Sequence, residues 1–417
     1  MEQPVTVAPT DGAHPRPHGG QTAVPCWFLR GGTSRGPFFR ATDLPESPTA
    51  RDAVLLAALG SPDPRQIDGL GGAGPLTSKA GIVGRSERPD VDLEFLFAQV
   101  QPGGDTVDTT PNCGNMLAAV VPFAVESGLL VPQEDLTTAR VLTLNTSMVA
   151  EITVRTPEGP AGRAVEYAGD TRIDGVPGTA SPVTINFLDT AGSVCGVLLP
   201  TGNARDRVTA DGVGPLDVTC VDNGMPLVLV AAADLGRTGY ETVAELDADT
   251  ELKRRVEALR LVCGELMGLG DVSARNYPKM TLIAPPAHGG TLSTRSFIPH
   301  VCHASIGVLA AVTVATACVL DGTVAHRTAR LPTGDGTGLT VSVEHPAGAF
   351  GVELGLDRSH GTPHVTRSAL VRTARLIMAG DVLVPRRAWN TEKDGTATGT
   401  DRTTTEKDRT DTEKDRT

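Results

Sequence analysis

Two patterns of apolar residues divide the chain. Short runs that alternate apolar and polar residues, or are rich in Val, Ile and Thr, predict half-buried β-strands. These runs are 92–100, 140–146, 149–156, 182–188, 193–200, 226–232, 280–285 and 338–345. Two longer segments, 116–130 and 308–320, are Ala-rich and too continuous for a one-sided surface helix. They predict helices buried on most faces, the first kinked or repositioned by Pro122.

The two predicted helices resemble each other. MLAAV at 116–120 and VLAAV at 308–312 each follow a short turn that contains glycine. This similarity predicts two related halves, 21–195 and 196–385, each with strands around a central helix. A cleft between such halves would face two helix N-termini, where unpaired N–H groups and helix dipoles favour anions.

The ends of the chain have a different composition. Residues 1–20 are rich in Pro, Gly, Thr and His and show no periodicity, and TEKD recurs at 391, 405 and 412 within residues 386–417. The tail has almost no apolar side chains and equal numbers of acidic and basic ones. We therefore expect a disordered leader and a disordered charged tail, since neither can bury enough surface to offset its ordering entropy.

Composition excludes several classes of function. The net charge of the 417 residues is −12, without a basic stripe, which argues against nucleic-acid binding. The longest helix-like apolar segment is too short to span a bilayer, and the first residues lack a signal-peptide core. No His, Cys or carboxylate cluster has metal-ligand spacing. The cysteines form no C-x-x-C pair, which favours free thiols and a cytoplasmic protein; they are Cys26, Cys113, Cys195, Cys220, Cys263, Cys302 and Cys318.

Three glycine-containing stretches carry candidate chemistry. In DTTPNCGNM, Cys113 precedes an apolar run and could be a nucleophile, a metal ligand, a proton donor or a core residue. In DGLGGAGPLTSKAGIVG, Lys79 enters an apolar strand, either as a partly desolvated base or as a side chain extending to solvent. In LRGGTSRGPFF, Arg30, Thr33, Ser34 and Arg35 could bind a carboxylate or form a turn with solvated arginines.

In this order, RGGTSRGPFF, DGLGGAGPLTSKAGIV and VDTTPNCGNMLAAVVPFAVESGLL resemble the PrpF family of isomerases. Its members include methylaconitate and methylitaconate isomerases and 4-oxalomesaconate tautomerases. The resemblance continues to RTARLIMAGDV at 372–382 and so covers residues 22–385. It implies the α/β (α+β) diaminopimelate-epimerase-like fold, with two similar halves of strands wrapped around a central helix. It also implies double-bond isomerisation in small unsaturated di- and tricarboxylates without a cofactor or metal.

The resemblance assigns Lys79 and Cys113 as the proton-transfer pair. A thiol at a helix N-terminus near an ammonium suits that role. Asn112, Gly114 and Asn115 would donate N–H groups to a carboxylate or developing enolate. Thr33 and Ser34 would hold a second carboxylate, together with Arg30 and Arg35. Candidates on the opposite wall are Lys279, Arg295, His303, Ser305 and Gly307.

Two departures from related sequences refine this prediction. Epimerases of this fold use two facing thiols, whereas the counterpart of Cys113 here is Ala304 or Ser305, neither of them a thiol. This argues for the lysine-containing isomerase chemistry and against a two-cysteine racemase. Arg35 stands where the family usually has Lys, which permits carboxylate binding but not proton transfer.

The sequence therefore predicts a cofactor-independent isomerase of an aconitate-, methylaconitate- or oxalomesaconate-like substrate. A keto–enol tautomerase of a 4-oxalomesaconate is the first alternative. A relative of the same fold that binds a carboxylate without turning it over is the second. Whether the chain forms a homodimer stays open, and His345 in HPAG is interpreted as a turn residue.

Overall fold

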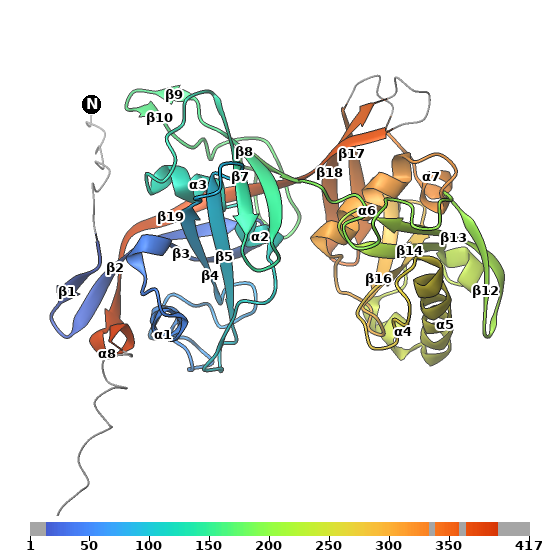
Figure 1. Ribbon diagram of the computed structural model, residues 1–417, viewed down its shortest axis with the longest axis horizontal. Coiled ribbons are helices and arrows are strands. Elements are labelled where there is room, and N and C mark those ends of the chain that lie inside the picture. Colours follow the sequence, from blue (N-terminus) through green and yellow to red (C-terminus); the bar gives the residue numbers. More distant parts are fainter. Residues whose placement is uncertain (1–13, 333–337, 358–363, 391–417) are drawn as a thin grey trace, which may run out of the picture.

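The computed structural model describes residues 14–332, 338–357 and 364–390. It shows two lobes, each with strands around a central helical segment, joined by the long strand β19 (His364–Pro385) that runs through both (Figure 1). No helix among the described residues has the length and apolar character needed to cross a membrane.

The first lobe contains β1 (Arg16–His18), β2 (Gln21–Gly31), β3 (Ser34–Arg40), η1 (Ala41–Asp43), α1 (Pro48–Leu59), β4 (Lys79–Arg85), β5 (Leu93–Val100), β6 (Val107–Asp108), α2 (Gly114–Leu117), α3 (Val120–Glu126), β7 (Leu136–Thr143), β8 (Met148–Arg155), β9 (Glu158–Gly159), β10 (Gly162–Arg163) and β11 (Pro182–Phe187). The second contains β12 (Asp206–Ala210), β13 (Val213–Asp222), β14 (Pro226–Ala231), η2 (Ala232–Leu235), α4 (Val243–Ala248), α5 (Thr250–Leu266), β15 (Lys279–Ala284), β16 (Leu292–Phe297), α6 (Val308–Val319), α7 (Val324–Thr328), β17 (Gly338–His345) and β18 (Gly348–Asp357). The short helix α8 (Arg386–Trp389) follows β19.

Strand pairing confirms the predicted duplication. In the first lobe β3 pairs with β4 and β5 with β7 in parallel, while β4–β5 and β7–β8 are antiparallel. The second lobe repeats this pattern with β14–β15 and β16–β17 parallel, and β15–β16 and β17–β18 antiparallel. Each parallel pair requires a crossover, and the matching crossovers contain α1 and α5 or the central helices. β4 therefore corresponds to β15, and α2 to α6.

Alternation along each strand divides side chains between two faces. The inner face packs on the central helices: Val83 of β4 and Ile283 of β15 belong to the same core cluster as α3 and α6. On the outer face, Ile82 packs with α1 and Leu282 with α5. The terms inner face and outer face are used in this sense below.

The central helix of the first lobe is broken, as Pro122 led us to expect. The predicted segment 116–130 forms α2 and α3 instead of one helix. Pro122 has no N–H to donate to the carbonyl of Ala118, four residues earlier. The Ala118 and Ala119 N–H groups donate instead to the backbone carbonyls of Asn115 and Met116, three residues earlier, at 3.2 and 3.0 Å. In the second lobe, α6 matches the predicted segment 308–320 apart from its last residue.

The predicted strand 193–200 is wrong, because this segment forms turns. The carboxylate of Asp222 accepts the N–H groups of Val194 and Cys195, both at 2.8 Å. Gly192 and Gly196 have positive φ angles of 71° and 85°, which a strand does not accommodate. The backbone donors of this segment therefore bond to a side chain rather than to a neighbouring strand.

Parts of both predicted disordered ends are ordered. β1 lies within the predicted leader and pairs with β2 across Gly19 and Gly20, a two-residue turn that glycine favours. α8 lies within the predicted tail. Its Trp389 packs against the apolar cluster that contains Val54, Leu55 and Ala58 of α1. Residues 1–13 and 391–417, including the TEKD repeats, lie outside the described residues.

The two lobes meet at the beginnings of their central helices. Gly114 is the first residue of α2 and Val308 the first of α6. A Cβ atom at Gly114 would lie 2.9 Å from Cγ2 of Val308, which is closer than carbon atoms pack. The helix N-termini that the sequence predicted to face a common cleft are therefore in contact.

We expect Gly114→Ala to destabilise the protein by about 1–3 kcal/mol, because its methyl group would overpack this contact. The midpoint of thermal unfolding should fall by a few degrees, measured by circular dichroism. Adding Val308→Ala should recover most of the loss. Gly214→Ala is the control, since a Cβ there meets nothing within 4 Å. An unchanged midpoint in Gly114→Ala would contradict the close contact.

Candidate active site

Lys79 is the first residue of β4 and is held on the inner face. Its side chain is almost completely buried, and Nζ donates a hydrogen bond to Oε1 of Gln99 at 2.5 Å. Nζ also lies 4.8 Å from the centroid of the Phe97 ring, a cation–π contact. Of the two interpretations left open by the sequence, the structure agrees with a desolvated lysine and not with one extending to solvent.

Cys113 is the N-cap residue of α2, as predicted. Its carbonyl accepts the Leu117 N–H at 2.9 Å, and its own N–H donates to Oδ1 of Asn112 at 2.8 Å. The thiol is free and half-buried. Gln99 pairs with Lys79 of β4 on one side and with Asp108 of β6 on the other. Lys79 thus lies two strands from the segment that leads into Cys113.

The duplicated fold relates this pair to residues of the second lobe. Lys279 begins β15 as Lys79 begins β4, and Gly307 is the N-cap of α6 as Cys113 is of α2. Nζ of Lys279 lies 3.7 Å from where a Cβ atom of Gly307 would be.

The N-caps of the two central helices give a further possible counterpart of Cys113. Alignment of these N-caps gives Gly307, whereas the sequence similarity gave Ala304 or Ser305. The second lobe still offers no thiol at this position, so the argument against a two-cysteine site is unchanged.

Four of the predicted residues of the second wall lie together around the start of α6. Burial lowers the pKa of Lys279, and burial together with the nearby Lys279 ammonium lowers the pKa of His303. The Ser305 N–H donates to Nδ1 of His303 at 2.8 Å. With Gly307, these residues form a polar wall that carries a positive charge.

The turn between β2 and β3 packs on α2. Nδ2 of Asn115 donates to Oγ1 of Thr33 at 2.9 Å, and a Cβ at Gly32 would lie only 2.1 Å from Oδ1 of Asn115. Ser34 is 1% exposed, and its buried Oγ has no hydrogen-bond partner among the described residues. Thr33 and Ser34 are thus next to α2, where the sequence placed a carboxylate site.

Three predicted arginines lie on outer faces instead. Nη1 of Arg30 donates to the carbonyls of Gly32 and Thr373 at 2.8 and 3.1 Å, and the side chain lines a separate cavity with Arg375. Arg35 is exposed, and its guanidinium lies over Phe28, 5.5 Å from the ring centroid. Arg295 of β16 lies between two residues whose side chains face inward, so its own side chain faces outward. The structure does not bring these three together with Lys79 and Cys113.

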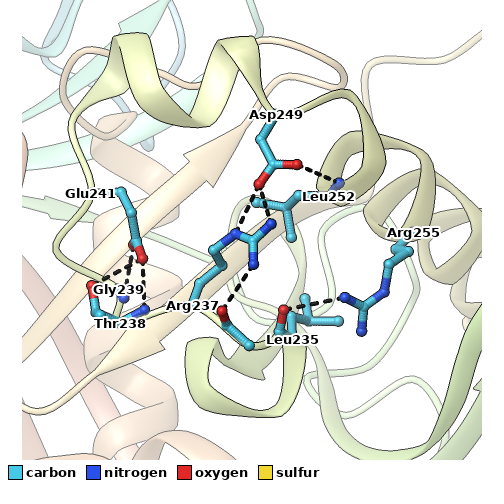
Figure 2. Close-up of polar contacts among 9 residues, drawn as sticks. Leu235, Arg237, Thr238, Gly239, Glu241, Asp249, Leu252 and Arg255 are labelled. Atoms are coloured by element: carbon cyan, nitrogen blue, oxygen red, sulfur yellow. Dashed lines mark hydrogen bonds and ion pairs between the residues drawn. The ribbon is translucent and has the colours of Figure 1, made fainter.

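Arg295 is bonded to a rigid loop. Its Nε donates to the carbonyl of Glu241 at 2.7 Å and its Nη1 to that of Thr294 at 2.8 Å. The carboxylate of Glu241 in turn accepts the N–H groups of Thr238 and Gly239 at 2.7 and 2.9 Å (Figure 2). Figure 2 also shows Arg237 bonded to Asp249, the N-cap of α5. Arg295 thus supports the second lobe.

The sequence analysis missed two residues near the start of α6. Arg372 of β19 is 3% exposed and faces inward, as do its neighbours Leu370 and Ala374 in the core cluster. His345, interpreted as a turn residue, lies 3.2 Å through Nδ1 from Oγ of Ser305. The alternation of side chains along a strand would have assigned Arg372 to the inner face, but only if the first and last residues of β19 had been known.

Among the described residues, no group of three or more His, Cys, Asp and Glu is placed to hold a metal ion.

Comparison with known proteins gives a consistent assignment. The family model described as PrpF protein matches residues 21–385. The chain is 53% identical over 370 residues to the 4-oxalomesaconate tautomerase of Pseudomonas putida, covering 89% of this chain and 98% of that protein. It is 52% identical to the (4E)-oxalomesaconate Delta-isomerase of Novosphingobium sp., covering 89% and 100%. The crystal structure of methylitaconate-delta-isomerase aligns with a TM-score of 0.76 at 34% identity, covering 89% of this chain and 97% of that one. The resemblance found in the three glycine-containing motifs is confirmed, and the chain belongs to the PrpF family.

Proposed function

We propose that this protein is a cofactor-independent isomerase of a small unsaturated tricarboxylate of the oxalomesaconate type. The relatives that share half of its residues over nearly their whole length act on oxalomesaconate by name. The methylitaconate isomerase is less similar, at 34% identity. Substrate class is assigned on this difference in similarity.

One observation carries the chemical part of the proposal. Lys79 is buried on the inner face with its ammonium fixed by Gln99, on strands that run beside the segment leading into Cys113. A buried amine and a half-buried thiol are two groups of the kind that serve as general base and general acid. A protein that only binds carboxylates would need neither.

The reaction requires one proton to leave and one to return. A base takes a proton from the carbon allylic to the C=C bond, and the electron pair delocalises into the conjugated carboxylate as a dienolate. The second group then donates a proton to the far end of the dienolate, and the double bond moves. Donors at the starts of α2 and α6 would stabilise the negative charge that develops on oxygen.

Carboxylate binding is divided between the two lobes in this proposal. Thr33, Ser34 and the N–H groups around Asn112, Gly114 and Asn115 would bind one carboxylate. Lys279, His303 and Ser305 would bind a second from the opposite wall. The cationic groups on inner faces offset an overall charge of −12, which would otherwise repel a polyanion.

The alternative is keto–enol tautomerisation of the same tricarboxylate, favoured by the similarity to the Pseudomonas putida tautomerase. Tautomerisation moves a proton between carbon and oxygen, whereas allylic isomerisation moves it between two carbons. The two reactions use the same acid–base pair and differ in where solvent hydrogen enters the product.

We predict that proton NMR in D₂O will show turnover of 4-oxalomesaconate, with deuterium at a carbon of the isomerised product. Lys79→Met and Cys113→Ser should each lower kcat/KM by about 10²–10⁴-fold, the range expected for loss of a general acid or base. Lys253→Met, a charge loss on α5, is the matched control. Turnover retained in both site variants would contradict the assignment of the pair. If the folded protein turns over no oxalomesaconate, aconitate or itaconate, a protein of this fold that binds a carboxylate without turning it over would be favoured.

We further predict that iodoacetamide modifies Cys113 before any other cysteine. Five of the seven thiols are buried, and only Cys113 and Cys195 are half-buried. Burial and then the nearby Asp222 carboxylate raise the pKa of Cys195 to about 12, which keeps it protonated and unreactive. Peptide mass spectrometry over time would measure the order, and activity should fall as Cys113 is labelled. Faster labelling of Cys195 would contradict this expectation.

A further inference from the structure

A row of contacts connects the strand shared by the two lobes with the start of α6. The guanidinium carbon of Arg372 lies 4.0 Å from the centroid of the Phe350 ring. That ring lies 4.7 Å from the ring of His345, centroid to centroid. Nδ1 of His345 is 3.2 Å from Oγ of Ser305. Residues of β19, β18, β17 and the loop before α6 thus form one continuous row.

Arg372 is an unusual residue at the beginning of this row. It is 3% exposed, its Nη1 donates to the carbonyl of Val371 at 2.8 Å, and its buried Nη2 has no partner among the described residues. Burial lowers the pKa of this guanidinium to about 10. A buried cation without a carboxylate partner costs stability, so its position needs a reason other than stability.

The structure fixes which nitrogen of His345 accepts a hydrogen bond. The Ala347 N–H donates to Nδ1 at 3.2 Å, which requires Nδ1 to be unprotonated. Oγ of Ser305 lies 3.2 Å from the same nitrogen and 3.5 Å from Nε2, so its hydroxyl shares the Nδ1 lone pair with Ala347. Burial and then Arg372 lower the pKa of His345 to about 4; His303 and Arg295 act in the same direction, and Asp174 opposes them. His345 is therefore neutral at physiological pH.

His345 could otherwise be protonated from solvent. It lines a cavity of about 420 Å³ together with Asp174, Tyr240 and Glu344. Protonation at Nδ1 would remove the acceptor used by both Ala347 and Ser305. The positive charge of Arg372, on β19 beyond β18, acts against that protonation.

We propose that Arg372 and His345 are positioning residues, which hold the Ser305 hydroxyl in place before α6 and so define one carboxylate-binding wall. Ser305 is then fixed from two sides, by His303 through its N–H and by His345 through its Oγ. The inference rests on the proposed function, because Ser305 belongs to that wall. Neither Arg372 nor His345 needs to touch the substrate.

The test is the pH dependence of kcat/KM and KM between pH 4 and 9 for the full-length enzyme. In Arg372→Met one cause of the low His345 pKa is lost, so that pKa rises toward its ordinary value and the acid limb should move up by on the order of one pH unit. KM should then exceed the wild-type value about 5-fold at pH 4, where the His345 of the variant is mostly protonated, and approach the wild-type value at pH 8. Arg375→Met is the matched control, because Arg375 lies on the same strand but lines a cavity on the outer face.

His345→Asn tests the other half of the inference. An asparagine oxygen can accept the Ser305 hydroxyl and does not titrate, so this variant should keep a KM within about 3-fold of wild type and lose the acid limb. His345→Leu should raise KM at every pH. A KM increase in Arg372→Met that is equal at pH 4 and pH 8 would overturn the proposal, and would instead make Arg372 a direct carboxylate ligand.

An NMR titration separates this inference from the proposed function. Imidazole ¹⁵N signals of wild-type protein, with His345 assigned by its loss in His345→Asn, should show a neutral ring with Nδ1 unprotonated from pH 5.5 to 8. This readout needs no substrate and no refolded Arg372 variant. A His345 that titrates above pH 6 in the wild-type protein would overturn the positioning role even if isomerase activity were established. If no substrate is turned over but His345 is found to be neutral, the proposed function alone would be rejected.

Discussion

The contact between the starts of α2 and α6 is the constraint on which the structure depends. It requires glycine at position 114, because even a methyl group would collide with Val308. β19 fixes the same relation independently, since it pairs with β18 in one lobe and with β2 in the other. Two buried helices and one shared strand thus determine where the inner faces of both lobes converge. The strand starts that carry Lys79 and Lys279 belong to these inner faces.

Strand parity then determines which cations can take part in chemistry. Lys79, Lys279 and Arg372 occupy inner positions and are buried or half-buried, whereas Arg30, Arg35 and Arg295 occupy outer ones. The outer arginines bond to backbone carbonyls or stack on an aromatic ring, and Arg30 borders a separate cavity. A guanidinium stays charged and so suits such structural bonds. Because neighbouring residues of a strand point to opposite faces, a shift of one residue along a strand decides whether a cation lies on the inner or the outer face.

The sequence predicted the central helices, most strands and the position of Cys113 at a helix N-cap, because these depend on local periodicity and capping. It did not predict which face each arginine would occupy, since that requires the first residue of each strand and the location of α1 and α5. The failure at 193–200 has a similar cause: Val194 and Cys195 bond to Asp222, which is distant in sequence. Arg372 and His345 contact residues that are distant in sequence, and no local pattern predicts such contacts.

The duplicated fold also explains why the chemistry proposed here is one-sided. A racemase needs two groups on opposite faces of one carbon, and a symmetric fold provides them naturally, one from each lobe. Here the N-cap of the second central helix is Gly307, whereas that of the first is Cys113. Nζ of Lys279 lies 3.7 Å from where a Cβ atom of Gly307 would be. On the proposed mechanism Lys79 and Cys113 both belong to the first lobe, so the proton leaves and returns from the same side of the substrate. The second lobe, with Lys279, His303 and Ser305, is then free to bind carboxylate. On the proposed mechanism the two similar lobes thus have different tasks, one transferring protons and the other binding carboxylate.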